Sequence, residues 1–246
     1  MEFSIDPQVF EVLPGVCIGV VVARGIDNAE RESATALEIK ALLDNAMQGT
    51  RARFAGANVK EHPDIACYRE AFRTLGYKPN RFPSSVEALT SRVVKGNDLP
   101  DINPVVNLVN AVSLQFTLPM GAHDLDSIHG NLAVRFSREG ELFTPLGQSE
   151  PEKVPEGELV YADAREIRTR RWIWRQNDRG KVTEKSRNIF FPIDGFVDYN
   201  REAVLRSMEE LASRLKTLFG VPTSQYFVEQ KSRACELVTC DLDRRV

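Results

Sequence analysis

The first strong hydrophobic signal in the chain is the segment from Val16 to Ala23, which is continuously apolar and rich in valine. Because glycines bound it on both sides, it predicts a strand that is buried on both faces. A helix is expected next, since Asp27 and Glu30 have the spacing of a capping box. Apolar residues then recur at helical period toward Gly49, so the pattern indicates a strand followed by a helix.

Further helical patterns follow along the chain. One covers about residues 64–75 and ends before Gly76, and another begins with Ser84-x-x-Glu87 and ends before Gly96. A short helix is expected after Pro104. A last, long helix closes at Gly220, and its apolar face consists of Val204, Met208, Leu211, Leu215 and Leu218.

Strand patterns occupy the middle of the chain. Leu132, Val134 and Phe136 alternate with less apolar residues, which marks a strand. Other strands are expected at residues 159–163, 167–175 and 189–193. Helices at both ends and strands between them predict the α+β class, with a central, mostly antiparallel or mixed β-sheet flanked by helices. We expect one domain over residues 1–246.

Composition excludes several classes of protein. The longest apolar run is far shorter than the ~20 residues that span a bilayer, and acidic residues rather than a basic region precede it. We therefore expect no membrane segment, no export signal and a cytoplasmic location. The four cysteines, at 17, 67, 235 and 240, have neither Cys-x-x-Cys spacing nor a nearby histidine set. No zinc site, other metal, cofactor or disulfide framework is expected.

Charge is distributed unevenly along the chain. The net charge is −3, but residues 165–187 hold nine Lys or Arg against three acidic residues. A basic patch on an acidic protein predicts binding to one end of a polyanion rather than coating of DNA. The predicted phosphate contacts are Arg168, Arg170, Arg171, Arg175 and Lys181.

Trp172 and Trp174 lie two residues apart in the expected strand 167–175. On a strand, both indoles face one side and the neighbouring arginines face the other. Aromatic and guanidinium groups side by side suit stacking of an unpaired nucleotide and contact with its phosphates. Ordinary core packing by the tryptophans is the alternative.

The stretch from residue 107 to residue 135 combines apolar residues with recurring Asn, Asp and Gly, which is typical of a pocket rim. It resembles the B3/B4 editing domain of the phenylalanyl-tRNA synthetase β subunit, where Asn-x-Val-x-Leu leads to Pro-x-His-x-Phe-Asp-x-Asp and then Gly-x-Ile-x-Val-Arg. The residues in register are Asn110, Val112, Leu114, Pro119, Asp124, Asp126, Gly130, Val134 and Arg135. The likeness covers about residues 80–195, without synthetase active-site motifs, and so implies a free-standing B3/B4 protein.

The resemblance implies a tRNA-binding protein that hydrolyses mischarged aminoacyl-tRNA in trans at its 3′ aminoacyl end. An aminoacyl ester is already activated, so a deacylase needs mainly a positioned water, oxyanion donors and a pocket for the side chain. His123 is the candidate general base, because histidine titrates near pH 7. Asn110 and Asp124 are the other candidate catalytic residues, although Asp124 also suits a turn-capping role. The candidate substrate-binding residues are Arg81, Asn107, Ser113, Trp174, Gln176 and Asp178.

Four positions depart from the pattern that this sequence resembles. The family's threonine falls at Val109 and its histidine at Gly121, while His123 stands where the family has Phe. The family's glutamate, which helps to select a tyrosyl hydroxyl, falls at Gln176 or Asp178. These departures predict a side-chain preference other than tyrosine.

Two other functions fit the same residues. The fold can bind a free amino acid or an RNA element without catalysis, in which case the departures reflect loss of chemistry. Alternatively, the chain hydrolyses a small substrate that is not RNA, and the basic segment then has no effect on turnover.

Overall fold

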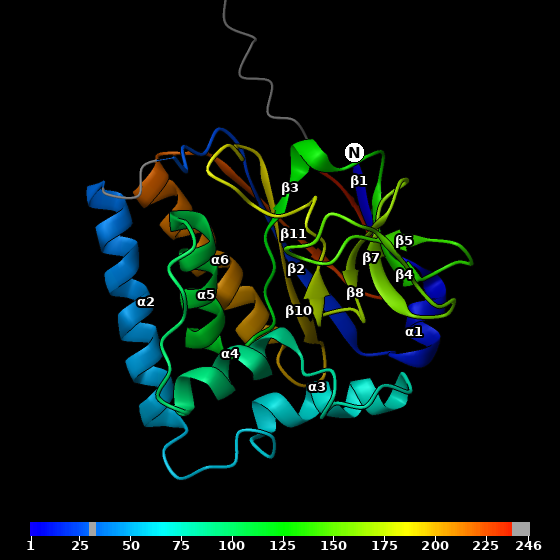
Figure 1. The fold of residues 1–246 in the computed structure, drawn as a ribbon, viewed down its shortest axis with the longest axis horizontal. Coiled ribbons are helices and arrows are strands. Elements are labelled where there is room, and N and C mark those ends of the chain that lie inside the picture. The colour runs from blue at the N-terminus through cyan, green and yellow to red at the C-terminus, as the bar shows by residue number, and fades with distance from the viewer. Residues whose placement is uncertain (30–32, 238–246) are drawn as a thin grey trace, which may run out of the picture.

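The computed structural model describes residues 1–29 and 33–237, and two sheets and a set of helices make up its architecture (Figure 1). A four-stranded antiparallel sheet has the order β11-β2-β10-β3. Its strands are β2 (Val16–Ala23), β3 (His123–Asp124), β10 (Ile189–Phe196) and β11 (Thr223–Val228). Every residue of β2 is buried, as the continuous apolar run predicts.

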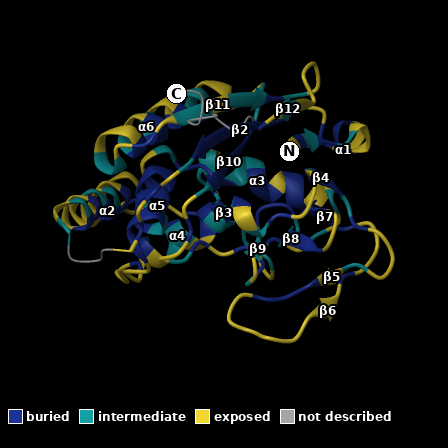
Figure 2. Ribbon diagram, turned by 90° about the horizontal axis from the view of Figure 1, so that it is seen from above, coloured by how far each residue is buried: buried dark blue, intermediate teal, exposed yellow. Residues whose placement is uncertain are grey.

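The second sheet has six strands in the order β12-β1-β4-β7-β8-β9. Only the β1–β4 pair of this sheet is parallel among the described residues. Its strands are β1 (Glu2–Ile5), β4 (Leu132–Phe136), β7 (Leu159–Ala162), β8 (Ile167–Arg170), β9 (Arg175–Gln176) and β12 (Ala234–Glu236). A small hairpin of β5 (Leu142–Phe143) and β6 (Glu152–Lys153) extends from it, flanked by exposed loops (Figure 2).

Helices cover the four-stranded sheet on the side away from the six-stranded sheet (Figures 1 and 2). These are α2 (Ala34–Arg53), α5 (Pro104–Phe116) and α6 (Arg201–Phe219). The remaining helices are α1 (Pro7–Val12), α3 (Pro63–Thr74), α4 (Ser85–Val94) and the short 3-10 helix η1 (Leu125–Ser127). The α+β class with mixed sheets flanked by helices is confirmed.

Two glycines allow α6 to lie close to the four-stranded sheet. A Cβ atom at Gly19 of β2 would lie 2.5 Å from the sulfur of Met208, and one at Gly195 of β10 would lie 2.5 Å from Val204 Cγ2. Neither position has room for a larger residue. The glycines therefore fix which face of β2 and β10 receives the helix.

The opposite face of β10 points toward the six-stranded sheet. Side chains alternate along a strand, so Phe190, Pro192 and Asp194 share this face. The ring of Phe190 lies 5.0 Å from that of Phe3 in β1, centroid to centroid, and Asp194 is hydrogen-bonded to Tyr161 of β7. The main core therefore lies between two sheets, and one carboxyl group is buried in it.

Several expected boundaries agree with the structure. The helices that end before Gly76 and Gly96 correspond to α3 and α4, and Ser84 caps α4 by accepting a hydrogen bond from Glu87 N at 3.4 Å. The helix that closes at Gly220 is α6.

Other expected boundaries were wrong. The first long helix begins at Ala34, because Ser33 rather than Asp27 caps it, and it continues through Gly49 to Arg53. Glu30, the other half of the proposed capping box, lies outside the described residues. The short strands β1, β11 and β12 were not anticipated, because their patterns are brief.

Candidate functional site

A cavity of about 180 Å³ opens between the two sheets. Its floor consists of His123, Tyr161, Trp172 and Asp194, each at most 3% exposed. Apolar walls come from Pro119, Met120, Ile173 and Pro192, and the more exposed rim includes Ser85, Gly121, Thr169, Trp174, Arg175 and Gln176. A small cavity with a few convergent polar groups is typical of a ligand site.

Asp194 is the buried acid of this floor. The Tyr161 hydroxyl and the Trp172 Nε1–H each donate a hydrogen bond of 2.6 Å to its Oδ1 atom. Burial raises the pKa of Asp194 to about 7, although these two donors act in the opposite direction. The carboxyl group therefore changes its charge near neutral pH.

Trp172 reaches Asp194 because the chain leaves strand geometry after β8. Arg171 and Trp172 have positive φ angles of 46° and 59°, in the left-handed region that L-residues rarely adopt. The expected continuous strand over 167–175 was therefore wrong: β8 ends at Arg170 and a turn precedes β9. This turn separates the indoles, so that Trp172 is fully buried and Trp174 stands at the rim. Strained backbone of this kind is concentrated at functional sites.

His123 forms the floor as a neutral ring. Burial, and secondarily the positive charge of Arg168, lower the pKa of His123 to about 3. This corrects the expectation of an imidazole that titrates near pH 7. The Gln176 Nε2–H group donates to Ala122 O at 2.7 Å and lies 3.4 Å from His123 Nδ1. In the tautomer whose Nδ1 accepts from Gln176, the imidazole proton is on Nε2 and the ring is a hydrogen-bond donor toward the cavity.

Four predicted site residues lie outside the cavity, and three of them form hydrogen bonds within the protein. Asn107 donates to Asp101 Oδ1 at 2.6 Å, and Ser113 donates to Leu118 O at 2.7 Å, so both fix the ends of α5. Asp124 accepts from Asp126 N at 3.0 Å and from Ser186 Oγ at 2.6 Å. Asn110 is half-buried on α5. Asp124 thus supports the segment that carries His123, and none of the four residues lines the cavity, where direct catalytic or binding roles were expected.

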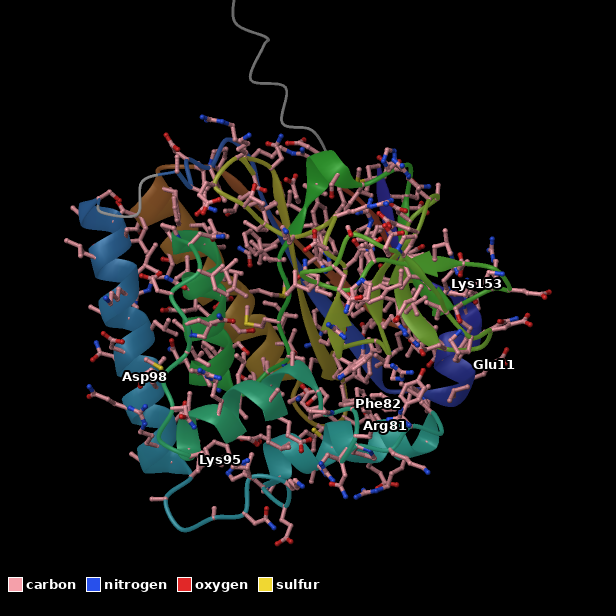
Figure 3. The ribbon with its side chains drawn as sticks, viewed as in Figure 1. Glu11, Arg81, Phe82, Lys95, Asp98 and Lys153 are labelled. Atoms are coloured by element: carbon pink, nitrogen blue, oxygen red, sulfur yellow. The ribbon has the colours of Figure 1, made fainter. Side chains whose placement is uncertain are left out.

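Two further predicted substrate residues also lie outside the cavity. Asp178 accepts hydrogen bonds of 2.8 Å from Gly147 N and 2.9 Å from Lys181 Nζ, so it ties two loops together. Arg81 is exposed on the connection between α3 and α4, where its guanidinium lies 5.1 Å from the Phe82 ring centroid (Figure 3). Of the two counterparts considered for the family's glutamate, Gln176 is the one that lines the cavity.

Two of the arginines predicted to bind RNA are buried in ion pairs. Arg168 is 1% exposed and its Nη2 lies 2.5 Å from Asp163 Oδ2. Arg170 binds both carboxylate oxygens of Glu158 at 2.8 Å and Glu152 Oε1 at 2.5 Å. This corrects the expectation that they contact phosphates, because a buried and fully paired guanidinium has no free face for RNA.

A cluster of aromatic and guanidinium groups remains at the mouth of the cavity. The guanidinium carbon of Arg171 lies 3.8 Å from the Phe82 ring centroid and 4.6 Å from that of Trp174. The guanidinium carbon of Arg175, which also lines the cavity, lies 5.9 Å from the Trp174 centroid. Lys181 is exposed and paired with Asp178. The cluster of Phe82, Arg171, Trp174 and Arg175 offers stacking surface beside the cavity.

Sequence reasoning missed the central residue of the site. Asp194 follows an apolar run and precedes Gly195, and Asp-Gly usually indicates a turn. The available signal was the two-residue period, which places Asp194 on the same face as Phe190 and Pro192. Nothing in the spacing indicated that Tyr161 and the Trp172 indole would meet it from the other sheet.

Comparison with known proteins identifies the domain. The B3/4 domain family matches residues 67–220, which include every residue that lines the cavity. The chain belongs to the B3/4 domain family. The resemblance seen in the sequence is thereby confirmed.

Relatives and a solved structure place this B3/4 domain near one kind of ligase subunit. The phenylalanine–tRNA ligase beta subunit of Idiomarina loihiensis is 35% identical over 116 residues, which cover 40% of this chain and 14% of that subunit. The corresponding subunit of Fusobacterium nucleatum is 30% identical over 143 residues, or 58% of this chain and 17% of the subunit. The chain thus spans less than a fifth of either subunit.

An N-terminal fragment of the phenylalanyl-tRNA synthetase beta subunit from Pyrococcus horikoshii shares the fold of this B3/4 domain. Its TM-score is 0.50 at 11% sequence identity, and the match covers 92% of this chain and 53% of the fragment. Within residues 1–29 and 33–237, no helix is long and apolar enough to cross a membrane. In the same ranges, no three His, Cys, Asp or Glu side chains come together as a metal site.

Proposed function

We propose that this B3/4 domain binds aminoacyl-tRNA and hydrolyses the ester of a mischarged amino acid in trans, as an editing deacylase. The observation that carries the proposal is the cavity between the sheets, which combines apolar walls with a buried acid and a neutral imidazole donor. Its relatives are beta subunits of phenylalanine–tRNA ligase, whose substrates include a tRNA.

The proposed reaction is attack by water on the carbonyl carbon of the aminoacyl ester. The bond from that carbon to the ribose oxygen breaks, and the released hydroxyl takes up a proton. The His123 Nε2–H group is suited to stabilise the developing oxyanion, because it is buried and uncharged. Since its pKa of about 3 makes this imidazole a weak base, the free hydroxyl of the terminal ribose orients the attacking water in our proposal.

The mouth of the cavity suits the end of a tRNA. A terminal base stacks on Trp174, and Arg175 contacts the adjacent phosphate. Both residues line the cavity, which receives the aminoacyl group in our proposal. This arrangement leaves Arg168 and Arg170 as structural residues and assigns RNA contact to the side chains that remain accessible.

The decisive experiment is a single-turnover deacylation screen of tRNAs charged with each amino acid. We expect hydrolysis of a limited set, a loss in His123→Ala, and no change in His129→Ala, a matched variant at an exposed histidine outside the cavity. A 2′-deoxy or 3′-deoxy terminal ribose should stop the reaction if the ribose hydroxyl orients the water.

Binding without hydrolysis is the second candidate function. It is favoured because no strong base lies among the described residues of the cavity floor. His123 is neutral, and Asp194 accepts hydrogen bonds from two donors. Tight binding of a free amino acid with no deacylation of any charged tRNA would support it over the first proposal.

A further inference from the structure

Among the residues that the structure describes, the carboxyl group of Asp194 receives its hydrogen bonds on one oxygen only. Both hydrogen bonds to this carboxyl group, from Tyr161 and Trp172, end on Oδ1. Within residues 1–29 and 33–237, no protein donor is hydrogen-bonded to Oδ2. The residue lines the cavity although it is only 2% exposed. Oδ2 is therefore an acceptor on a cavity-lining residue that is available to a donor group of a ligand.

The charge of Asp194 is also uncompensated by the protein. In the described part of the chain, no Lys, Arg or His forms a salt bridge with it. The titratable groups near it are uncharged at neutral pH: Tyr68 of α3, Tyr161 of β7, His123 of β3, and Cys17 of β2 on the opposite face of the sheet. On the other face of β10, the apolar side chain of Val204 in α6 packs beside Gly195. Of the cations around the cavity, Arg168 is paired with Asp163, Arg171 is paired with Glu158, and Arg175 stands at the rim.

Aromatic rings complete the surroundings of this acid. Tyr161, Trp172 and Trp174 all line the cavity. The faces of aromatic rings attract cations, most strongly when water is excluded. A buried carboxylate with aromatic walls is therefore complementary to a primary ammonium group and unfavourable for an anion.

We propose that Asp194 is the specificity residue that binds the α-ammonium group of the aminoacyl moiety through its Oδ2 atom. This inference rests on the proposed function, since it places an aminoacyl group in the cavity. The free amino group would donate to Oδ2 while Tyr161 and Trp172 hold Oδ1. Blocked or deaminated acyl groups would leave the carboxyl group without its partner and be rejected.

The test compares ligands that differ only in the amino group. The probes are the amides of the twenty amino acids, which resist hydrolysis, and the matching desamino amides, with binding measured by calorimetry. We expect at least one amino amide to bind wild type about tenfold or more tighter than its desamino partner. Asp194→Asn should abolish this preference, whereas Asp126→Asn, at an exposed aspartate outside the cavity, should retain it.

A second measurement keeps the test independent of how the variant folds. Below pH 7 the carboxyl group of Asp194 must release its proton before it binds an ammonium group. The affinity of wild type for the amino amides should therefore rise with pH. Calorimetry in buffers of different ionisation enthalpy should detect the released proton. Equal binding of amino and desamino amides, an ammonium preference that survives in folded Asp194→Asn, or no amide binding at all would overturn the inference. Amide binding without any deacylation would instead remove only the proposed hydrolysis.

Discussion

The Nε2 atom of His123 lies 3.3 Å from the position that a Cβ atom would occupy at Gly121. In the sequence pattern that this chain resembles, the histidine falls at 121 and an aromatic residue at 123. The imidazole of His123 thus fills the space beside residue 121, and a side chain at 121 would displace it. The two departures from the pattern therefore lie next to each other in the structure.

Removing the His123 imidazole should slow deacylation without changing its pH dependence. Loss of one oxyanion donor lowers the rate by about 10²–10³-fold. His123→Ala should show this loss in single turnover, and His123→Gln should recover part of it, because an amide also donates. A general base would instead give wild type a pH inflection that His123→Ala abolishes. Such a result would contradict the donor role.

Adding a methyl group at Gly121 should affect the same ring. The new Cβ would lie 3.2 Å from Pro192 Cγ and 3.3 Å from His123 Nε2, closer than ordinary contact. Gly121→Ala should therefore lower the deacylation rate severalfold in wild type but less in a His123→Ala background. A double-mutant cycle measures this coupling. Additive effects would show that the methyl group acts on something other than His123.

Asp194 and His123 should give opposite pH dependences of folding stability. Between about pH 4 and 7, folded Asp194 keeps a proton that the unfolded chain has lost, so the free energy of unfolding falls as pH rises. Between about pH 3 and 6.5, the unfolded chain protonates His123 whereas the folded protein does not, so this free energy rises with pH. The two contributions oppose each other where the windows overlap.

Single substitutions should expose each contribution. When the pH is raised from about 4.5 to about 6, the free energy of unfolding of Asp194→Asn should increase by ~1–2 kcal/mol relative to that of wild type. The free energy of unfolding of His123→Gln should decrease by a similar amount relative to wild type. Urea unfolding at the two pH values measures the change. The same slope in all three proteins would show that neither group is buried as described.

Arg168 should behave as a structural residue. Arg168→Ala leaves Asp163 buried without its partner, so we expect a loss of ~3–5 kcal/mol in the free energy of unfolding. Arg168→Met combined with Asp163→Asn should cost less, because neither buried charge remains. Chemical denaturation compares them. A fully stable Arg168→Ala with weakened tRNA binding would restore the original RNA assignment.

The accessible cations should control tRNA affinity. Arg175→Glu and Lys181→Glu should weaken binding and reduce its salt dependence, because each removes a phosphate contact. Arg206→Glu, at an exposed arginine on α6, changes charge equally and serves as the control. Filter binding over a range of salt concentrations provides the measurement. Equal losses in all three variants would indicate a general charge effect rather than a site.

The sequence predicted those features that depend on local chemistry. Val16–Ala23 was correctly predicted as a buried strand because every residue in it is apolar. The helix α4 was correctly predicted because Ser84 and Gly96 mark its two ends. His123, Trp174 and Gln176, which the family pattern and the basic segment proposed as site residues, line the same cavity.

The rest of the site depends on contacts between distant segments. Asp194 acquires its character from Tyr161 and Trp172, which lie 33 and 22 residues away. Arg168 and Arg170 look like free cations in the sequence because their acidic partners become neighbours only when β7 and β8 pair. Positive φ angles at Arg171 and Trp172 follow no residue preference, so they could not be predicted from propensity.

The hydrogen bonds to Asp194 join two sheets that otherwise have separate backbone networks. A ligand in the cavity between them would touch β7 and the turn on one side and β3 and β10 on the other. Its residence time is then tied to the rate at which the sheets separate locally. Ligand binding in the cavity should therefore slow amide hydrogen exchange far from the cavity mouth, in strands that do not contact the tRNA.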